Sequence, residues 1–339
     1  MDEINIIQNN SQDDNQSNIN PIEPQNYPKK NNDICFLPSR FNEEAPTFFK
    51  ILLFLVGFLG LQLVAFPVTI FLTFFIIDET LLIALVNFIS YVLGFGGIIL
   101  LLSLFQKGKF FKIAFSGFKK KNTYIWGILL LGLALLVQTI ISIISTAILN
   151  GLNYNGSYVS QNEQSIEEIL SSGYAVLMIV PVVLFAPIIE EFTYRIGLVD
   201  SIGKKNRLRG LIFSSLIFGL LHFNGFTILL EILFGPILQE AGVSLADGTI
   251  NDLLRQLLVE VLNLPIYILM GACLGLAYLI TGDISASILA HALNNTLSVI
   301  ISFVSGTASL SYFIPDIFVK LANLSLSPYF NSIMFFINK

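Results

Sequence analysis

Long runs without a charged residue dominate the chain from Ile51 onward. A membrane helix needs roughly 20 mostly apolar residues, and none of these runs shows the alternation of membrane-barrel strands. The pattern therefore predicts an all-α protein, a polytopic membrane helix bundle of about eight transmembrane helices. The runs are Ile51–Ile77, Thr80–Gln106, Tyr124–Leu149, Ile169–Ile189, Gly210–Leu230, Val261–Gly282, Ile284–Pro315 and Leu321–Asn338.

The polar positions divide the chain into four parts. Residues 1–46 are rich in Asn and Gln and hold no apolar run, which predicts a disordered tail that buries too little apolar surface to order itself. Residues 47–150 are expected to form the N-terminal transmembrane helices, residues 169–305 a core, and residues 306–339 a C-terminal membrane helix. Glu231–Glu260 is partly polar and predicts an outer loop, with an amphipathic helix near Leu253–Leu262.

Composition supports the membrane class. Hydrophobic residues make up 54% of the chain, charged residues only 12%, and the mean hydropathy is +0.76, whereas about a quarter of the residues in a soluble domain are charged. The net charge of −5 argues against a nucleic-acid partner, so the lipid bilayer is the expected environment.

The distribution of Lys and Arg predicts the orientation, because short cytoplasmic loops are enriched in both. Two loops are basic and are expected in the cytoplasm, whereas the loop with Glu163, Glu167 and Glu168 carries no basic residue and is expected outside. Together these loops predict a multi-pass protein of the cell membrane with a cytoplasmic N-terminus. The basic residues are Lys107, Lys109, Lys112, Lys119, Lys120 and Lys121 after the second run, and Lys204, Lys205, Arg207 and Arg209 after the fourth.

Two adjacent carboxylates, Glu190 and Glu191, follow the fourth apolar run. Glu191 and Arg195 are four residues apart and share a helix face, which predicts that they pair. Glu190 projects about 100° away and is left to face a cavity. A helix end at the headgroups is the simpler interpretation, but Glu190 lies roughly 20 Å along a helix from the basic loop at Lys204.

The only two histidines of the chain, His222 and His291, also lie inside apolar runs. Phe218 precedes His222 by four residues and Asn295 follows His291 by four, so each shares a helix face with its histidine. Each histidine alone is compatible with a packed, hydrogen-bonded residue. Because ionisable residues at membrane depth are costly and usually functional, their coincidence with the Glu pair predicts one buried cavity open to the cytoplasm.

These side chains are the components of a hydrolytic site. A buried Glu beside His can act as a general base on water, either directly or with a metal held by His222 and His291. Asn295, together with His291, is placed to stabilise an oxyanion. The same groups would also suit a proton relay in a transporter.

In order along the chain, these sets resemble the CPBP family of CAAX prenyl proteases and bacteriocin-processing (Abi) proteins. The family motifs EExxxR, FxxxH and HxxxN correspond to Glu190–Arg195, Phe218–His222 and His291–Asn295. The resemblance covers roughly residues 175–305. One departure is Ile196, which stands between Arg195 and Gly197 where the family usually has Gly directly after Arg.

The resemblance implies an intramembrane endopeptidase that cleaves a membrane-associated or prenylated peptide. Glu190 would activate water with His222, Glu191 and Arg195 would support it, and His291 with Asn295 would form the oxyanion site. It leaves open whether one divalent metal, such as zinc, is required or none. The alternatives are a bacteriocin-immunity or scaffold protein without catalysis, and then a transporter.

Overall fold

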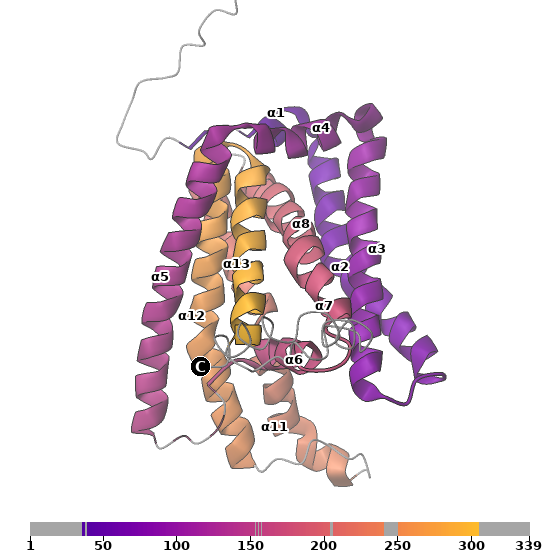
Figure 1. Ribbon diagram of the computed structural model, residues 1–339, viewed down its shortest axis with the longest axis vertical. Helices are drawn as coiled ribbons and strands as arrows, with labels where there is room; N and C mark the ends of the chain where they lie inside the picture. Colours follow the sequence, from indigo (N-terminus) through magenta and orange to yellow (C-terminus); the bar gives the residue numbers. More distant parts are fainter. Residues whose placement is uncertain are drawn as a thin grey trace, which may run out of the picture. The chain divides into compact units, whose positions relative to one another are not determined.

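The computed structural model describes Phe36, Leu37, residues 39–152, Tyr154, Gly156 and residues 158–203, 206–240 and 250–304. Within these residues every regular element is a helix (Figure 1), which confirms the predicted all-α class. The predicted tail up to Cys35 and the predicted helix Leu321–Asn338 lie outside the described residues. The elements are α1 (Arg40–Glu44), α2 (Thr47–Thr73), α3 (Glu79–Leu104), η1 (Phe105–Gly108), α4 (Lys109–Ser116), η2 (Gly117–Lys119), α5 (Lys121–Gly151), α6 (Gln161–Leu170), α7 (Val176–Val180), η3 (Pro181–Phe185), α8 (Ala186–Glu191), η4 (Phe192–Val199), α9 (Asp200–Ile202), α10 (Arg207–Leu221), α11 (Gly225–Glu240), α12 (Ile250–Thr281) and α13 (Ile284–Val304).

The described residues contain six helices long and apolar enough to cross a membrane, or seven if α10 and α11, bent by 51°, form one broken span. Large apolar side chains on these helices are exposed, for example Leu63, Phe66 and Ile143. A bilayer would cover such faces, because lipid removes the cost of exposing them to water. The chain is therefore a multi-pass membrane protein.

Polar caps and left-handed residues determine where several helices begin and end. The side chains of Asp78, Ser160 and Asn206 accept hydrogen bonds from backbone N–H groups in the first turns of α3, α6 and α10, as N-cap residues do. Gly282, with φ of 64°, separates α12 from α13. Glycine carries no Cβ and adopts this left-handed conformation without strain, so the chain reverses there.

α12 lies at the centre of the packing and contacts α5, α10, α11, α13 and η4. Close approach to α10 depends on glycine: a Cβ on Gly219 would come within 2.3 Å of the Ile268 side chain and 3.0 Å of its backbone nitrogen. Small residues allow membrane helices to pack backbone against backbone. The continuous span Val176–Ile202 lies between this group and α2 and α3, because it contacts both.

Three boundaries differ from the sequence predictions. The described residues of the predicted outer loop Glu231–Glu260 are helical, because residues 231–240 end α11 and residues 250–260 begin α12, so the helix expected near Leu253–Leu262 is continuous with the following span. The basic stretch before Lys121 contains α4, which buries Phe110 against the core. The fourth span does not end at Ile189 but continues through the Glu pair to Ile202.

Part of the predicted tail is folded. Phe41 is 2% exposed and its ring stacks on Phe110, and the Leu37 N–H donates to the Leu279 carbonyl at 3.0 Å. The hydroxyl of Tyr278 donates to Asp200 Oδ2 at 2.6 Å, and this network includes Ser39. A tail boundary at residue 46 is therefore too late, since aromatic packing and buried hydrogen bonds hold this segment.

The basic segments gather at one end of the bundle. Lys109 pairs with Glu44 at 2.6 Å and Lys120 with Asp283 at 2.8 Å, and Arg207 hydrogen-bonds to the Leu37 carbonyl. Figure 1 shows α1 and α4 at this end and α6 and α11 at the other. The predicted orientation depends on this placement of the basic segments and of the acidic helix α6 at opposite ends. The orientation itself stays a prediction.

Candidate active site

Glu191 and Arg195 form a fully buried ion pair. Arg195 Nε lies 2.7 Å from Glu191 Oε2 and Nη2 lies 3.3 Å from Oε1, and both side chains are 0% exposed. The third arm of the guanidinium, Nη1, donates at 3.1 Å to Ser214 Oγ, which itself donates to the Tyr194 carbonyl. The predicted pairing is confirmed, and it uses the fork geometry that only Arg offers to a carboxylate.

The backbone around this pair is π-helical. η3 begins at Pro181, and η4 begins at Phe192, directly after the Glu pair, and contains Arg195. Such bulges are rare and are frequent at functional sites, because the wider turn re-aims side chains without breaking the helix. They therefore flank the carboxylates on both sides.

α13 brings a histidine to the same carboxylate. His291 Nδ1 lies 2.9 Å from Glu191 Oε1, and the Ser287 hydroxyl hydrogen-bonds to Oε2. An ionised carboxylate only accepts hydrogen bonds, so the proton of the imidazole is on Nδ1 and Nε2 faces the other way. Glu191 thus fixes the orientation and the tautomer of His291.

Glu190 is the carboxylate without a hydrogen-bonded partner. Its Oε2 is buried, accepts no hydrogen bond from the described residues, and lies 3.9 Å from His291 Nε2. The Glu190 side chain is 15% exposed, whereas Glu191 is completely enclosed. The geometry therefore distinguishes the two acids: Glu191 is held by several hydrogen bonds, whereas Glu190 Oε2 accepts none from the described residues.

His222 is held in a different way, at the C-terminal end of α10. Its Nδ1 lies 2.7 Å from the Phe218 carbonyl, which can only accept, so Nδ1 carries the proton and Nε2 holds the lone pair in the neutral ring. The ring stacks on Tyr267, with centroids 4.9 Å apart and planes at 19°. The ring of Phe218 contacts both imidazoles, with its centroid 4.5 Å from that of His222 and 6.0 Å from that of His291.

Asn295 belongs to the neighbouring turn of α13. Its Nδ2 donates at 2.9 Å to the carbonyl of Val182 in η3, and Asn294 donates to its Oδ1 at 3.4 Å. The amide therefore ties α13 to the π-helical segment and keeps one N–H of its NH₂ group for another acceptor. No hydrogen bond or ion pair joins His222 or Asn295 to Glu190 in the described part of the chain.

Sequence reasoning missed several polar residues of this region. Ser287 precedes His291 by four residues, and Ser214 precedes Phe218 by four, so helical spacing placed both on the functional faces. Tyr267 and Glu260 carried no such signal, because their role depends on how α12 meets α10. Tyr267 stacks on His222, and Glu260 accepts a hydrogen bond from the backbone N–H of Asn224, two residues after His222.

The donor set does not fit a closed metal site. The described residues bring no three His, Cys, Asp or Glu side chains together in a metal-binding arrangement, and His291 Nδ1 is engaged by Glu191. Zinc sites use at least three protein ligands, whereas here only Glu190 and His291 Nε2 approach each other. A metal at His222 and His291 stays a prediction.

Together, the fold and these side chains define a helical membrane protein with an acid–imidazole site at membrane depth. Residues 172–297 match the family model described as type II CAAX prenyl endopeptidase Rce1-like. This match confirms the resemblance to the CPBP family that the three motifs indicated, and it supports a membrane protease. No curated protein and no solved structure gives a significant match to the chain.

Proposed function

We propose that this protein is an intramembrane endopeptidase that hydrolyses a peptide bond of a prenylated or otherwise membrane-associated peptide. The observation that carries the proposal is the division of labour between adjacent acids. Glu191 is saturated by Arg195 and His291, whereas Glu190 keeps a buried oxygen without a hydrogen bond beside His291. The family match supports a lipidated substrate.

In the proposed reaction, Glu190 removes a proton from water while the water oxygen attacks the carbonyl carbon of the scissile bond. His222 orients the water by accepting a hydrogen bond at Nε2, which its bond to the Phe218 carbonyl leaves free. The negative charge on the carbonyl oxygen is stabilised by the amide of Asn295 and by His291, which donates from Nε2 once the ring has taken up a second proton, with Glu191 at Nδ1 compensating the charge. When the C–N bond breaks, Glu190 returns the proton to the leaving amine, so one water is consumed.

Cleavage of a farnesylated peptide by the purified protein tests this function. Glu190→Gln and His222→Gln should each lower kcat by about 10²–10⁴-fold, the range of a general base. Asn295→Ala should lower kcat, whereas Ser298→Ala is the control on the same helix, because the exposed Ser298 hydroxyl bonds to the backbone carbonyl of Asn294. If Glu190→Gln cleaves at the wild-type rate in a folded sample, the assignment is wrong.

Two further assays separate the remaining alternatives. Metal analysis of the active protein and its activity with a chelator decide between a metal-dependent and a glutamate-dependent reaction. An identical peptide without the lipid shows whether the prenyl group is recognised. If the protein has only a scaffold or immunity role, the Glu190→Gln variant should still protect cells in a protection assay. If protection depends on proteolysis, the variant should not protect them.

The orientation is tested with the cysteine of the tail. Cys35 and Cys273 are the only cysteines of the chain, and Cys273 is buried. In a Cys273→Ala variant, a membrane-impermeant maleimide should label Cys35 only after cells are opened, if the N-terminus is cytoplasmic. Labelling in intact cells would reverse the predicted orientation.

A further inference from the structure

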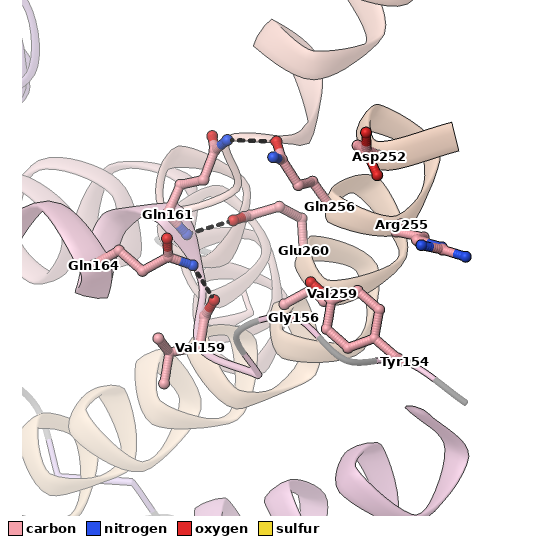
Figure 2. A pocket seen from close by; sticks show the side chains of 10 residues that line it. All are labelled: Tyr154, Gly156, Val159, Gln161, Gln164, Asp252, Arg255, Gln256, Val259 and Glu260. Carbon is pink, nitrogen blue, oxygen red and sulfur yellow. Dashed lines mark hydrogen bonds between the residues drawn. The ribbon is translucent and has the colours of Figure 1, made fainter. Parts of the chain in front are cut away.

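Glu260 of α12 is a buried carboxylate outside the three motifs. It is 2% exposed, and each of its oxygens accepts a backbone hydrogen bond, Oε1 from Gln161 at 2.7 Å and Oε2 from Asn224 at 3.1 Å. Figure 2 shows the bond to Gln161, at the edge of a cavity of about 430 Å³. Glu260 takes part in none of the ion pairs of the described residues.

The two bonded amides belong to segments that need an acceptor. Asn224 lies in the break between α10 and α11, where the chain bends by 51°, and Gln161 is the first residue of α6. N–H groups at helix starts have no partner within the helix, and a backbone group that is buried without a hydrogen bond costs free energy. One carboxylate therefore stabilises a helix break and a helix start together.

This break is the one that holds His222. His222 is the C-cap of α10 and lies two residues before Asn224. Its ring stacks on Tyr267, seven residues after Glu260 and hence on the same face of α12. The Tyr267 hydroxyl lies 2.7 Å from Ser160 Oγ, the N-cap of α6. Two side chains of α12 thus hold both the ring of His222 and the backbone beside it.

We propose that Glu260 is a positioning residue for His222, acting through Asn224, with Tyr267 as the second support. The effect of Glu260 on the rate of cleavage rests on the proposed protease function, but its effect on the position of His222 does not. A buried acid in a membrane helix is costly, and here it orients a helix break rather than neutralising a cation.

Glu260→Gln is the informative substitution. It preserves size, but its amide has one acceptor oxygen and an NH₂ group that only donates. Of the two backbone N–H groups, one therefore loses its acceptor, and the break that carries His222 shifts. Gln256→Ala is the matched control, because Gln256 lies one turn earlier on α12, is exposed, and among the described residues accepts a hydrogen bond only from the Gln161 side chain, at 3.1 Å.

Two readouts in the full-length protein test the proposal. The chain has two histidines, so ¹⁵N-histidine labelling gives two sets of ring signals, which His222→Gln assigns. We expect Glu260→Gln to shift the His222 signals and leave those of His291 unchanged. We also expect kcat to fall by about tenfold to hundredfold, with KM within about twofold, because a misplaced group weakens the transition state rather than substrate binding. Gln256→Ala should change neither.

The outcomes separate this proposal from the proposed function. If the wild-type protein cleaves nothing, the ring signals still decide the positioning role. Unchanged His222 signals in folded Glu260→Gln would overturn it, whatever the activity. If Glu260→Gln does not fold, Tyr267→Phe, which keeps the ring and loses the hydroxyl, should shift the same signals, and wild-type signals there would overturn the proposal.

Discussion

Removing the guanidinium from the buried pair should be among the most destabilising single changes in this protein. In Arg195→Met, the carboxylate of Glu191 loses bonds of 2.7 and 3.3 Å, and Ser214 loses its donor. Both charged side chains are 0% exposed, so water cannot replace these bonds. Removing one partner of a buried ion pair costs about 3–5 kcal/mol, and we expect a loss of that size in the free energy of unfolding.

The partly exposed pair of Lys109 and Glu44 is the matched control. Its contact is equally short at 2.6 Å, but the side chains are 53% and 31% exposed. Exposed ion pairs contribute about 0–1 kcal/mol, because water solvates the charge that is left behind. Lys109→Met should therefore be nearly neutral, and the comparison isolates burial from bond length.

Denaturant titration of the purified protein in micelles measures both costs. The only tryptophan, Trp126, lies in α5 and reports unfolding by fluorescence. Adding Glu191→Gln to Arg195→Met removes the stranded charge, so the double variant should be more stable than the sum of the two single losses implies. The reasoning is refuted if Arg195→Met costs less than about 1 kcal/mol, or if the two losses are simply additive.

Three further substitutions test separate contacts. Gly197→Ala would place a Cβ 2.8 Å from that of Phe54, and overpacking of this kind should lower the free energy of unfolding by about 1–3 kcal/mol, measured by the same titration. Tyr278→Phe removes the donor at 2.6 Å from buried Asp200 and should cost about 1.5–3 kcal/mol, as hydrogen bonds to charged groups do; a wild-type midpoint would contradict this. The pKa of Glu163 is raised above its ordinary value of 4.5, because nearby protein atoms reduce the hydration of this exposed side chain and because Glu167 and Glu260 carry like charges. A raised pKa means that folding disfavours the charged form of the acid, so stability is greatest below pH 4.5 and falls as pH rises through the folded-state pKa. Glu163→Gln removes this charge, so it should raise the melting temperature at neutral pH and have no effect below pH 4.5.

The membrane class and the pairing of Glu191 with Arg195 follow from the order of residues along the chain, whereas about eight spans were expected and the described residues contain six or seven. Run length decides which segments can cross a bilayer, and a spacing of four residues decides which side chains share a helix face. For the same reason the motifs could be recognised, since each lies within one or two turns of a single helix. Ser287 could have been found by this rule, because it lies one turn before His291.

Contacts between helices were decided only by the tertiary structure. The sequence does not show that His291 hydrogen-bonds to Glu191 rather than to Glu190. It also does not show that Phe218 contacts both imidazoles or that Tyr267 stacks on His222. The sequence also predicted too late a start for the sixth span, because the polar residues at the beginning of α12 resemble a loop. Only the structure shows that Glu260 is buried there and accepts two backbone hydrogen bonds. Local spacing determines each helix face, but which faces meet depends on how α12 packs against α10 and α13, and that packing joins residues far apart in the chain.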